Sequence, residues 1–297
     1  MQELRVRHIT RYRYARPVRF GEHRVMLRPR DDADQTLLHE RLIITPEPIE
    51  LRFGRDDHGN WFATARFASQ AHELCFKSEI RVARPLELRL TSPRLLELPP
   101  LRGQDATPQK PADPATAWAR RFLAHPGARP GLETIAAMSR AIRSSFAYRR
   151  RLEHGVQSAA ETLSTGSGAC RDFAVLLVEA ARALGLEARF ASGYVHTPAL
   201  AGRPRRAGGG HTHAWAYVRT PDHGWIDVDP TAGTVGSEGL VRIAVADQPT
   251  DAIPIQGVYF GDAAHYLGMD VKVEVRADVP TKRRQMSDEL LGLQSVA

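Results

Sequence analysis

The sequence predicts an α+β protein in which an N-terminal antiparallel β-domain precedes a core of helices packed on an antiparallel sheet. Three observations support this fold class. The first hundred residues of the 297-residue chain follow strand patterns with no helical segment between them. Helical periodicity begins only after residue 114, and strand patterns return after residue 187. Runs of strands followed by runs of helices are typical of α+β proteins.

The N-terminal β-domain is predicted to span residues 1–98. Apolar and basic side chains alternate over residues 4–14, residues 57–60 predict a turn, and residues 74–82 form a further extended run. These strands predict an antiparallel sheet or a small sandwich. The proline-rich and polar residues 99–114 are predicted to be a linker.

The second domain is assigned to residues 115–279, and residues 280–297 are expected to be a polar tail. Helical periodicity predicts helices over residues 115–124 and 132–146, and a third from Cys170 to a stop at Gly185. The strands that follow are predicted at residues 188–195, 211–219, 225–229, 258–260 and 271–275. The last of them are placed either in the core or back against the N-terminal domain.

The bulk composition favours a cytoplasmic globular enzyme. The chain has 42% hydrophobic residues, enough for a sizeable core. The N-terminus lacks the apolar stretch of a secretory signal, and no apolar run approaches the roughly 18 residues that a membrane span needs, so no membrane partner is expected. The two cysteines, Cys75 and Cys170, lie in different predicted domains and are expected to be free thiols.

The positive charge of the chain does not indicate a nucleic-acid partner. The net charge is +7, and the basic residues are almost all arginines scattered among 34 acidic residues. A nucleic-acid-binding protein usually gathers such charge into a stripe with interleaved aromatic side chains. A solvated arginine-rich surface, or one that favours acidic substrates, accounts for the pattern better.

Cys170 is the most informative residue because it stands where a glycine-rich stretch runs into a predicted helix. Free N–H groups and the positive end of the helix dipole favour a thiolate there, and the same N–H groups can hold an oxyanion. Gly168 and Ala169 leave room for a substrate carbonyl to approach the backbone. The alternative is a buried cysteine that acts as a small apolar side chain.

Two later strands supply partners for the thiol. Strand alternation puts His211, His213 and Trp215 on one face, and His213 is the candidate base with His211 as its rival. Asp229 ends the next strand, where its carboxylate can orient an imidazole, while Asp227 shares its face. Substrate or oxyanion support is assigned to Gly168, Ala169, His211, Trp215 and Asp227.

These segments together resemble the transglutaminase-like superfamily of papain-related thiol enzymes. The motifs that carry the resemblance are Gly168-Ala169-Cys170, His213-Ala214-Trp215 and the Trp225–Thr231 segment with Asp229-Pro230-Thr231. The resemblance implies Cys170 as nucleophile, His213 as base and Asp229 as orienting acid, on a papain-like core. Further segments are similar to the bacterial branch of the superfamily and to its N-terminal β-domain: Arg11–Tyr14, Leu27–Arg30, Asp57–Asn60, Phe146–Tyr148 and Glu161–Leu163.

The predicted function is a cysteine-dependent amide or peptide hydrolase that works through a thioester acyl-enzyme and needs no cofactor. Its expected partner is a peptide or protein amide substrate. One alternative is acyl transfer to an amine, as in a transglutaminase. Another is a non-catalytic peptide-binding protein. A third is a metal site built from His211, His213, Asp227 and Asp229, which are ligand types on neighbouring strands. The oligomeric state is left open.

Overall fold

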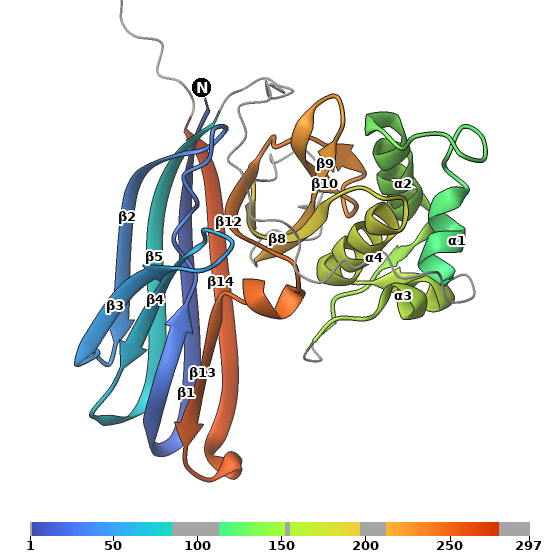
Figure 1. Ribbon diagram of the computed structural model, residues 1–297. Coiled ribbons are helices and arrows are strands. Elements are labelled where there is room, and N and C mark those ends of the chain that lie inside the picture. Colours follow the sequence, from blue (N-terminus) through green and yellow to red (C-terminus); the bar gives the residue numbers. More distant parts are fainter. Residues whose placement is uncertain (1, 85–112, 152–154, 197–211, 279–297) are drawn as a thin grey trace, which may run out of the picture.

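The computed structural model describes residues 2–84, 113–151, 155–196 and 212–278 (Figure 1). Most of the predicted linker at 99–114, the loop at 197–210, His211 and the tail at 280–297 lie outside the described residues. The α+β fold class is confirmed: an antiparallel β-domain lies beside a core of helices and a second sheet (Figure 1).

The N-terminal domain is one curled antiparallel sheet of seven strands. Five of them are β1 (Gln2–Val25), β2 (Thr36–Thr45), β3 (Glu50–Arg55), β4 (Trp61–Arg66) and β5 (Gln70–Arg84), in the order β2-β5-β1-β4-β3. The chain returns at its C-terminal end as β13 (Ile255–Phe260) and β14 (Tyr266–Asp278), and both pair with β1. Strands from the two ends of the chain therefore share one sheet.

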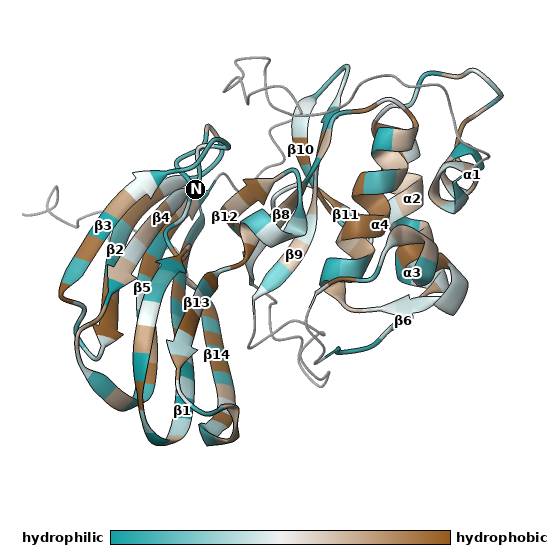
Figure 2. Ribbon diagram, turned by 60° about the horizontal axis from the view of Figure 1, so that its bottom comes forward, coloured by the Kyte–Doolittle hydropathy of each residue, from teal (hydrophilic) through white to brown (hydrophobic). Residues whose placement is uncertain are grey.

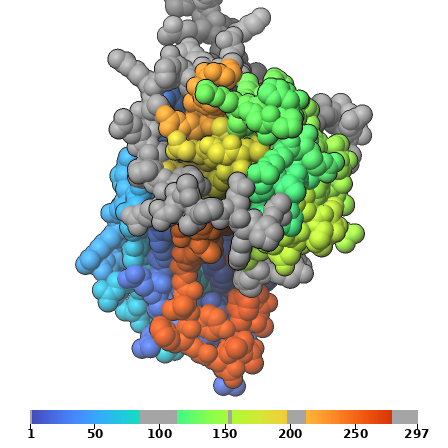
Figure 3. All heavy atoms as spheres, turned by 45° about the vertical axis from the view of Figure 1, so that its right-hand side comes forward, coloured from blue at the N-terminus to red at the C-terminus, as the bar shows by residue number. Residues whose placement is uncertain are grey.

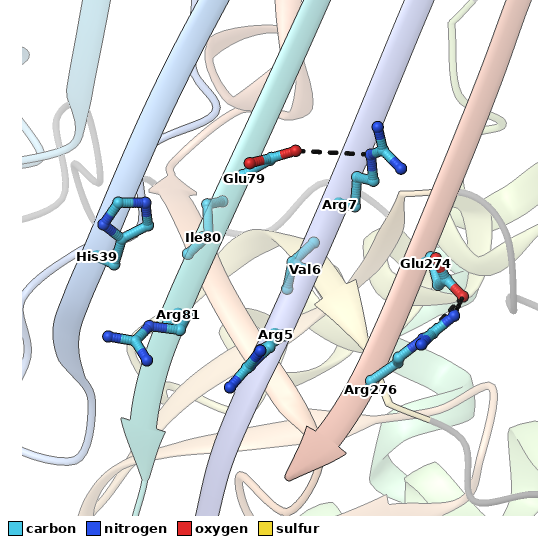
Figure 4. A pocket seen from close by; sticks show the side chains of 9 residues that line it. All are labelled: Arg5, Val6, Arg7, His39, Glu79, Ile80, Arg81, Glu274 and Arg276. Atoms are coloured by element: carbon cyan, nitrogen blue, oxygen red, sulfur yellow. Dashed lines mark hydrogen bonds and ion pairs between the residues drawn. The ribbon is translucent and has the colours of Figure 1, made fainter.

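The two faces of this sheet differ in polarity, as strand alternation requires. One face buries apolar side chains, whereas the other carries charged side chains in cross-strand rows. Figure 4 shows a shallow pocket on the charged face, where Arg7 of β1 pairs with Glu79 of β5 at 3.7 Å and Arg276 pairs with Glu274 within β14 at 2.5 Å. Such exposed pairs contribute little to stability but keep the face solvated.

The helices of the core are α1 (Pro114–Arg120), α2 (Leu132–Ser145), α3 (Ala159–Thr165) and α4 (Cys170–Ala183), with the others packed around α4. Helix α4 is largely hydrophobic (Figure 2), and Phe173, Leu176 and Leu177 are buried. It ends just before Gly185, whose φ of 86° is the left-handed conformation that favours glycine after a helix.

The second sheet has the order β11-β10-β9-β8-β12 and is antiparallel. Its strands are β8 (Ala188–Val195), β9 (His213–Thr220), β10 (Gly224–Asp229), β11 (Thr234–Val235) and β12 (Leu240–Ala246). A short parallel pair, β6 (Ala147–Tyr148) and β7 (Ser167–Gly168), precedes α4, and the 3-10 turns η1 (Pro249–Ala252) and η2 (Ala263–His265) flank β13. Helix α3 and strands β3 and β12 were not predicted from the sequence.

The two domains meet through an apolar layer and a polar one. Tyr194 of β8 and Val241 of β12 pack against Val6 and Ile80 of the N-terminal sheet. The Tyr194 hydroxyl also bonds the Nδ1 atom of buried His8 at 2.7 Å. In Figure 3 the orange-red C-terminal strands lie below the green and yellow core elements. Among the described residues, no helix is both long and apolar enough to cross a membrane.

Candidate active site

Cys170 begins helix α4, and its position is fixed by the segment before it. The carboxylate of Asp172, three residues after the N-cap, accepts a hydrogen bond from the backbone N–H of Ala169 at 2.8 Å. Its other oxygen accepts from the backbone N–H of Gln157 at 2.8 Å and from Arg151 at 2.8 Å. Asp172 is fully buried, so these bonds hold the start of the helix rigidly. Cys170 itself is partly exposed.

Gly168 has a steric reason to be glycine. A Cβ atom at this position would lie 2.9 Å from the Cβ of Asp172 and 3.0 Å from the Oε1 atom of Gln157. Any side chain would therefore displace the cap that fixes α4. Ala169 is buried at the N-cap position and contributes its backbone to the same arrangement. Both predicted support residues thus lie directly beside Cys170.

His213 and Asp229 form a buried pair beside the thiol. The Nε2 atom of His213 bonds the Oδ2 atom of Asp229 at 2.9 Å, and the two side chains are almost fully buried. The other carboxylate oxygen accepts from the backbone N–H groups of Thr231 at 2.9 Å and Ala232 at 3.3 Å. The carboxylate of Asp229 therefore orients the imidazole ring. The buried Nδ1 atom of the ring is left for the thiol of Cys170, and this thiol interacts with the imidazole.

The electrostatics of the three groups favour an ion pair between imidazole and thiol. Burial alone lowers the pKa of His213, but the charge and hydrogen bond of Asp229, together with Cys170, raise this pKa to about 10. Burial raises the pKa of the Cys170 thiol, and the hydrogen bond and charge of His213 outweigh burial and lower it. Near neutral pH the arrangement stabilises an imidazolium and a thiolate, the reactive form of cysteine.

Trp215 and Asp227 lie behind His213 and are not exposed. Trp215 stacks on the imidazole with ring centroids 5.9 Å apart, and its indole N–H donates to the Oδ1 atom of Asp227 at 2.6 Å. Asp227 in turn binds the guanidinium of Arg242 at 2.5 Å. The sequence assigned both residues to substrate or oxyanion support, whereas in the structure both are buried: Trp215 packs against His213, and Asp227 pairs with Arg242.

Arg242 is the centre of a buried ion cluster that joins the two domains. Its guanidinium also binds Asp32 at 2.6 Å and Asp34 at 3.3 Å in the N-terminal domain. The other members of the cluster are Arg30, which binds Asp32, and Arg84, which binds Asp34 at 2.6 Å. Gln35 and Asn60 hydrogen-bond to the backbone of β12 from the N-terminal side. The Leu27–Arg30 and Asp57–Asn60 segments noted in the sequence therefore serve the domain interface.

Two contributors to the site were given no role from the sequence. Tyr148 lies beside Gly168 because β6 pairs with β7, and its ring packs edge-on against Phe173. Arg242 stands alone as a charge within the apolar run of β12, which is fully buried. A lone arginine in such a run signals a buried ion pair, although its partners cannot be identified from the sequence.

Comparison with known proteins agrees with this geometry. Residues 4–83 match the family model described as the bacterial transglutaminase-like N-terminal region, and residues 116–230 match the transglutaminase-like superfamily. The chain belongs to the transglutaminase-like superfamily. It is a member of the bacterial branch that carries an N-terminal β-domain.

Relatives of this transglutaminase-like protein align with it over nearly the whole chain. An uncharacterized protein of Mycobacterium tuberculosis is 28% identical, with 91% of each chain covered. An uncharacterized protein of Mycobacterium leprae is also 28% identical, over 93% of this chain and 99% of its own. The crystal structure of a candidate cysteine protease from Cytophaga hutchinsonii has a TM-score of 0.65 at 22% identity, with 93% of this chain and 90% of that chain covered, and shows the same fold.

Proposed function

We propose that this transglutaminase-like protein is a cysteine-dependent amide or peptide hydrolase in which Cys170, His213 and Asp229 form the catalytic triad. The observation that carries the proposal is a partly exposed thiol at the start of a helix, beside an imidazole that a buried carboxylate holds at 2.9 Å. Nucleophile, base and orienting acid thus stand in the order that thiol acyl transfer requires.

The proposed reaction passes through an acyl-enzyme. The thiolate of Cys170 attacks the carbonyl carbon of the bound amide, and the backbone N–H of Cys170, which has no acceptor within the helix, is available to the oxyanion. The imidazolium of His213 then gives its proton to the departing amine as the C–N bond breaks. A water molecule, deprotonated by the imidazole, hydrolyses the thioester and releases the carboxylic acid and the thiol.

The contacts of the acidic residues do not favour the metal-site alternative. That site would need Asp227 and Asp229 to converge with histidines, yet Asp227 binds Trp215 and Arg242 while Asp229 binds His213. Both carboxylates therefore have other partners. The fourth candidate ligand, His211, lies outside the described residues.

The cytoplasm is the compartment that we propose for this protein. Both cysteines, Cys75 and Cys170, are free thiols in the structure. Free thiols are the state that a reducing compartment maintains.

The test is activity profiling against peptides, isopeptides and glutamine amides, read by mass spectrometry, with and without iodoacetamide and EDTA. A thiol hydrolase loses activity on alkylation and keeps it on chelation. A fluorescent primary amine added to the same reactions separates hydrolysis from acyl transfer. Formation of the carboxylic acid supports the proposal, whereas predominant amine incorporation at modest amine concentration would assign the protein as a transglutaminase.

A further inference from the structure

A short basic segment borders the thiol. The backbone N–H of Ala147 donates to the carbonyl of Gly166 at 2.8 Å, and that of Arg149 donates to the carbonyl of Gly168 at 2.8 Å. These bonds hold residues 147–151 against the stretch that leads into Cys170. Three consecutive arginines, Arg149 to Arg151, therefore lie at the edge of the candidate active site.

The side chains of this segment differ in what they contact. Arg151 binds the buried carboxylate of Asp172 at 2.8 Å, so its charge is neutralised. Arg150 is exposed, and among the described residues nothing pairs with it. In the parallel pairing of β6 with β7, Tyr148 lies opposite Gly168, and Arg150 and Cys170 each follow two residues further along the chain.

The Tyr148 hydroxyl connects this segment to the thiol electrostatically. Burial raises the pKa of Tyr148, and negative charge on Cys170 and on Asp229 raises it further, whereas Arg150 and Arg171 lower it. The phenol is thus within electrostatic reach of the thiol and of both guanidinium groups. Among the described residues, the nearby carboxylates of Asp172 and Asp229 are buried and already bound, so exposed Arg150 adds positive charge on the open side of the site.

We propose that Arg150 makes this site selective for substrates that carry a carboxylate next to the reacting carbonyl, such as amides within acidic peptides. An exposed guanidinium that no described residue pairs with can bind such a carboxylate at little desolvation cost and with good geometry. The inference rests on the proposed function for its substrate, but the positive field at Cys170 can be measured without any substrate.

The first experiment compares two alkylating reagents of similar size on the full-length protein. Iodoacetate carries a negative charge and iodoacetamide is neutral, so the ratio of their rates at Cys170 reports the field at the thiol. Arg150→Gln should lower the ratio about two- to fivefold at low ionic strength, as expected for one charge several ångströms away in a solvated site. The effect should shrink in about 0.5 M salt because exposed charges are screened.

Arg149→Gln is the matched control, because it removes the same charge from the same segment and, unlike Arg150, Arg149 is not among the charges that act on the Tyr148 hydroxyl. Its rate ratio should stay close to that of the wild type. An unchanged ratio in Arg150→Gln, or an equal fall in both variants, would overturn the inference.

The second experiment uses paired peptide amides that differ only by glutamate or glutamine beside the cleaved bond. The wild type should favour the glutamate peptide in kcat/KM, and Arg150→Gln should lose that preference mainly through KM. If the wild type cleaves both peptides equally and the variants match it, the inference fails while the proposed function stands. If no amide is cleaved but the alkylation ratio still depends on Arg150, the hydrolase proposal fails while the anion preference stands.

Discussion

Replacing Arg242 by methionine should destabilise the folded protein by about 3–5 kcal/mol at pH 7, which corresponds to a fall of roughly 10 °C in Tm. Arg242 is 1% exposed, and its guanidinium binds three carboxylates, those of Asp227, Asp32 and Asp34. The variant leaves these carboxylates buried with only Arg30 and Arg84 as counter-charges. Arg84 is then shared between Asp34 and Asp227, so three buried carboxylates have two guanidinium groups between them.

The pH dependence separates this mechanism from a simple packing loss. In the wild type, burial raises the pKa of Asp34, but Arg242 and Arg84 outweigh burial and lower it. The stability that Asp34 contributes is therefore present above its unfolded pKa and is lost as the pH falls through the lower folded value. In the variant, burial without enough counter-charge raises the pKa of the carboxylates in the cluster. One of them takes up a proton as the pH falls, and the variant then regains stability. The difference between the two proteins should shrink from pH 7 to pH 5.

Denaturant unfolding at the two pH values measures this difference. Arg276→Met is the control, because this arginine is 72% exposed and pairs on the solvated face of β14 with Glu274. Its effect should stay within about 0.5 kcal/mol. A similar loss in both variants would refute the reasoning. So would an Arg242→Met loss that is constant or larger at pH 5.

Three further predictions concern the site itself. His213→Ala should lower kcat/KM by orders of magnitude because base and nucleophile act as a unit, while His211→Ala should have the smaller effect; loss of activity in His211→Ala alone would reverse the assignment. Asp229→Asn removes the main charge that raises the pKa of His213, so the rate of Cys170 alkylation at pH 7 should fall at least tenfold. Peptide mapping measures this rate, and an unchanged rate would contradict the pairing of His213 with Asp229. Trp215→Phe keeps the stacked ring but removes the N–H bond to Asp227, so kcat should fall several-fold with KM little changed, and a pure loss of stability would assign Trp215 a structural role only.

The arrangement of the candidate site was largely predictable because its signals are local. A glycine-rich stretch before Cys170 predicts a helix start, and the turn between residues 220 and 224 predicts that β9 and β10 pair. Alternation then places His213 and Asp229 on one side of that hairpin. The same local reasoning assigned Trp215 and Asp227 to substrate or oxyanion support, because it cannot distinguish a buried polar face from an exposed one.

The strand pairing between the two ends of the chain, which the sequence left open, and the ion pairs of the domain interface could not be predicted, because both depend on contacts between distant parts of the chain. β14 pairs with β1 across nearly the whole sequence, with Glu3 opposite Asp278. Arg242 likewise meets Asp32 more than two hundred residues away. Neither pairing leaves a local pattern, because the sequence of each strand indicates only that the strand is extended and half or fully buried.

The central claim is that His213 and the start of α4 hold Cys170 as a reactive thiolate, and the pH dependence of its alkylation tests this most directly. The rate with limiting iodoacetamide would be followed at each cysteine by peptide mapping. An unperturbed thiol with a pKa of about 8.5 loses roughly 80-fold in rate between pH 8 and pH 6.

Cys170 should show a much shallower fall, should react faster than buried Cys75 at neutral pH, and should regain the steep profile in His213→Ala. A steep profile in the wild type, or labelling of Cys75 at an equal or higher rate, would contradict the account.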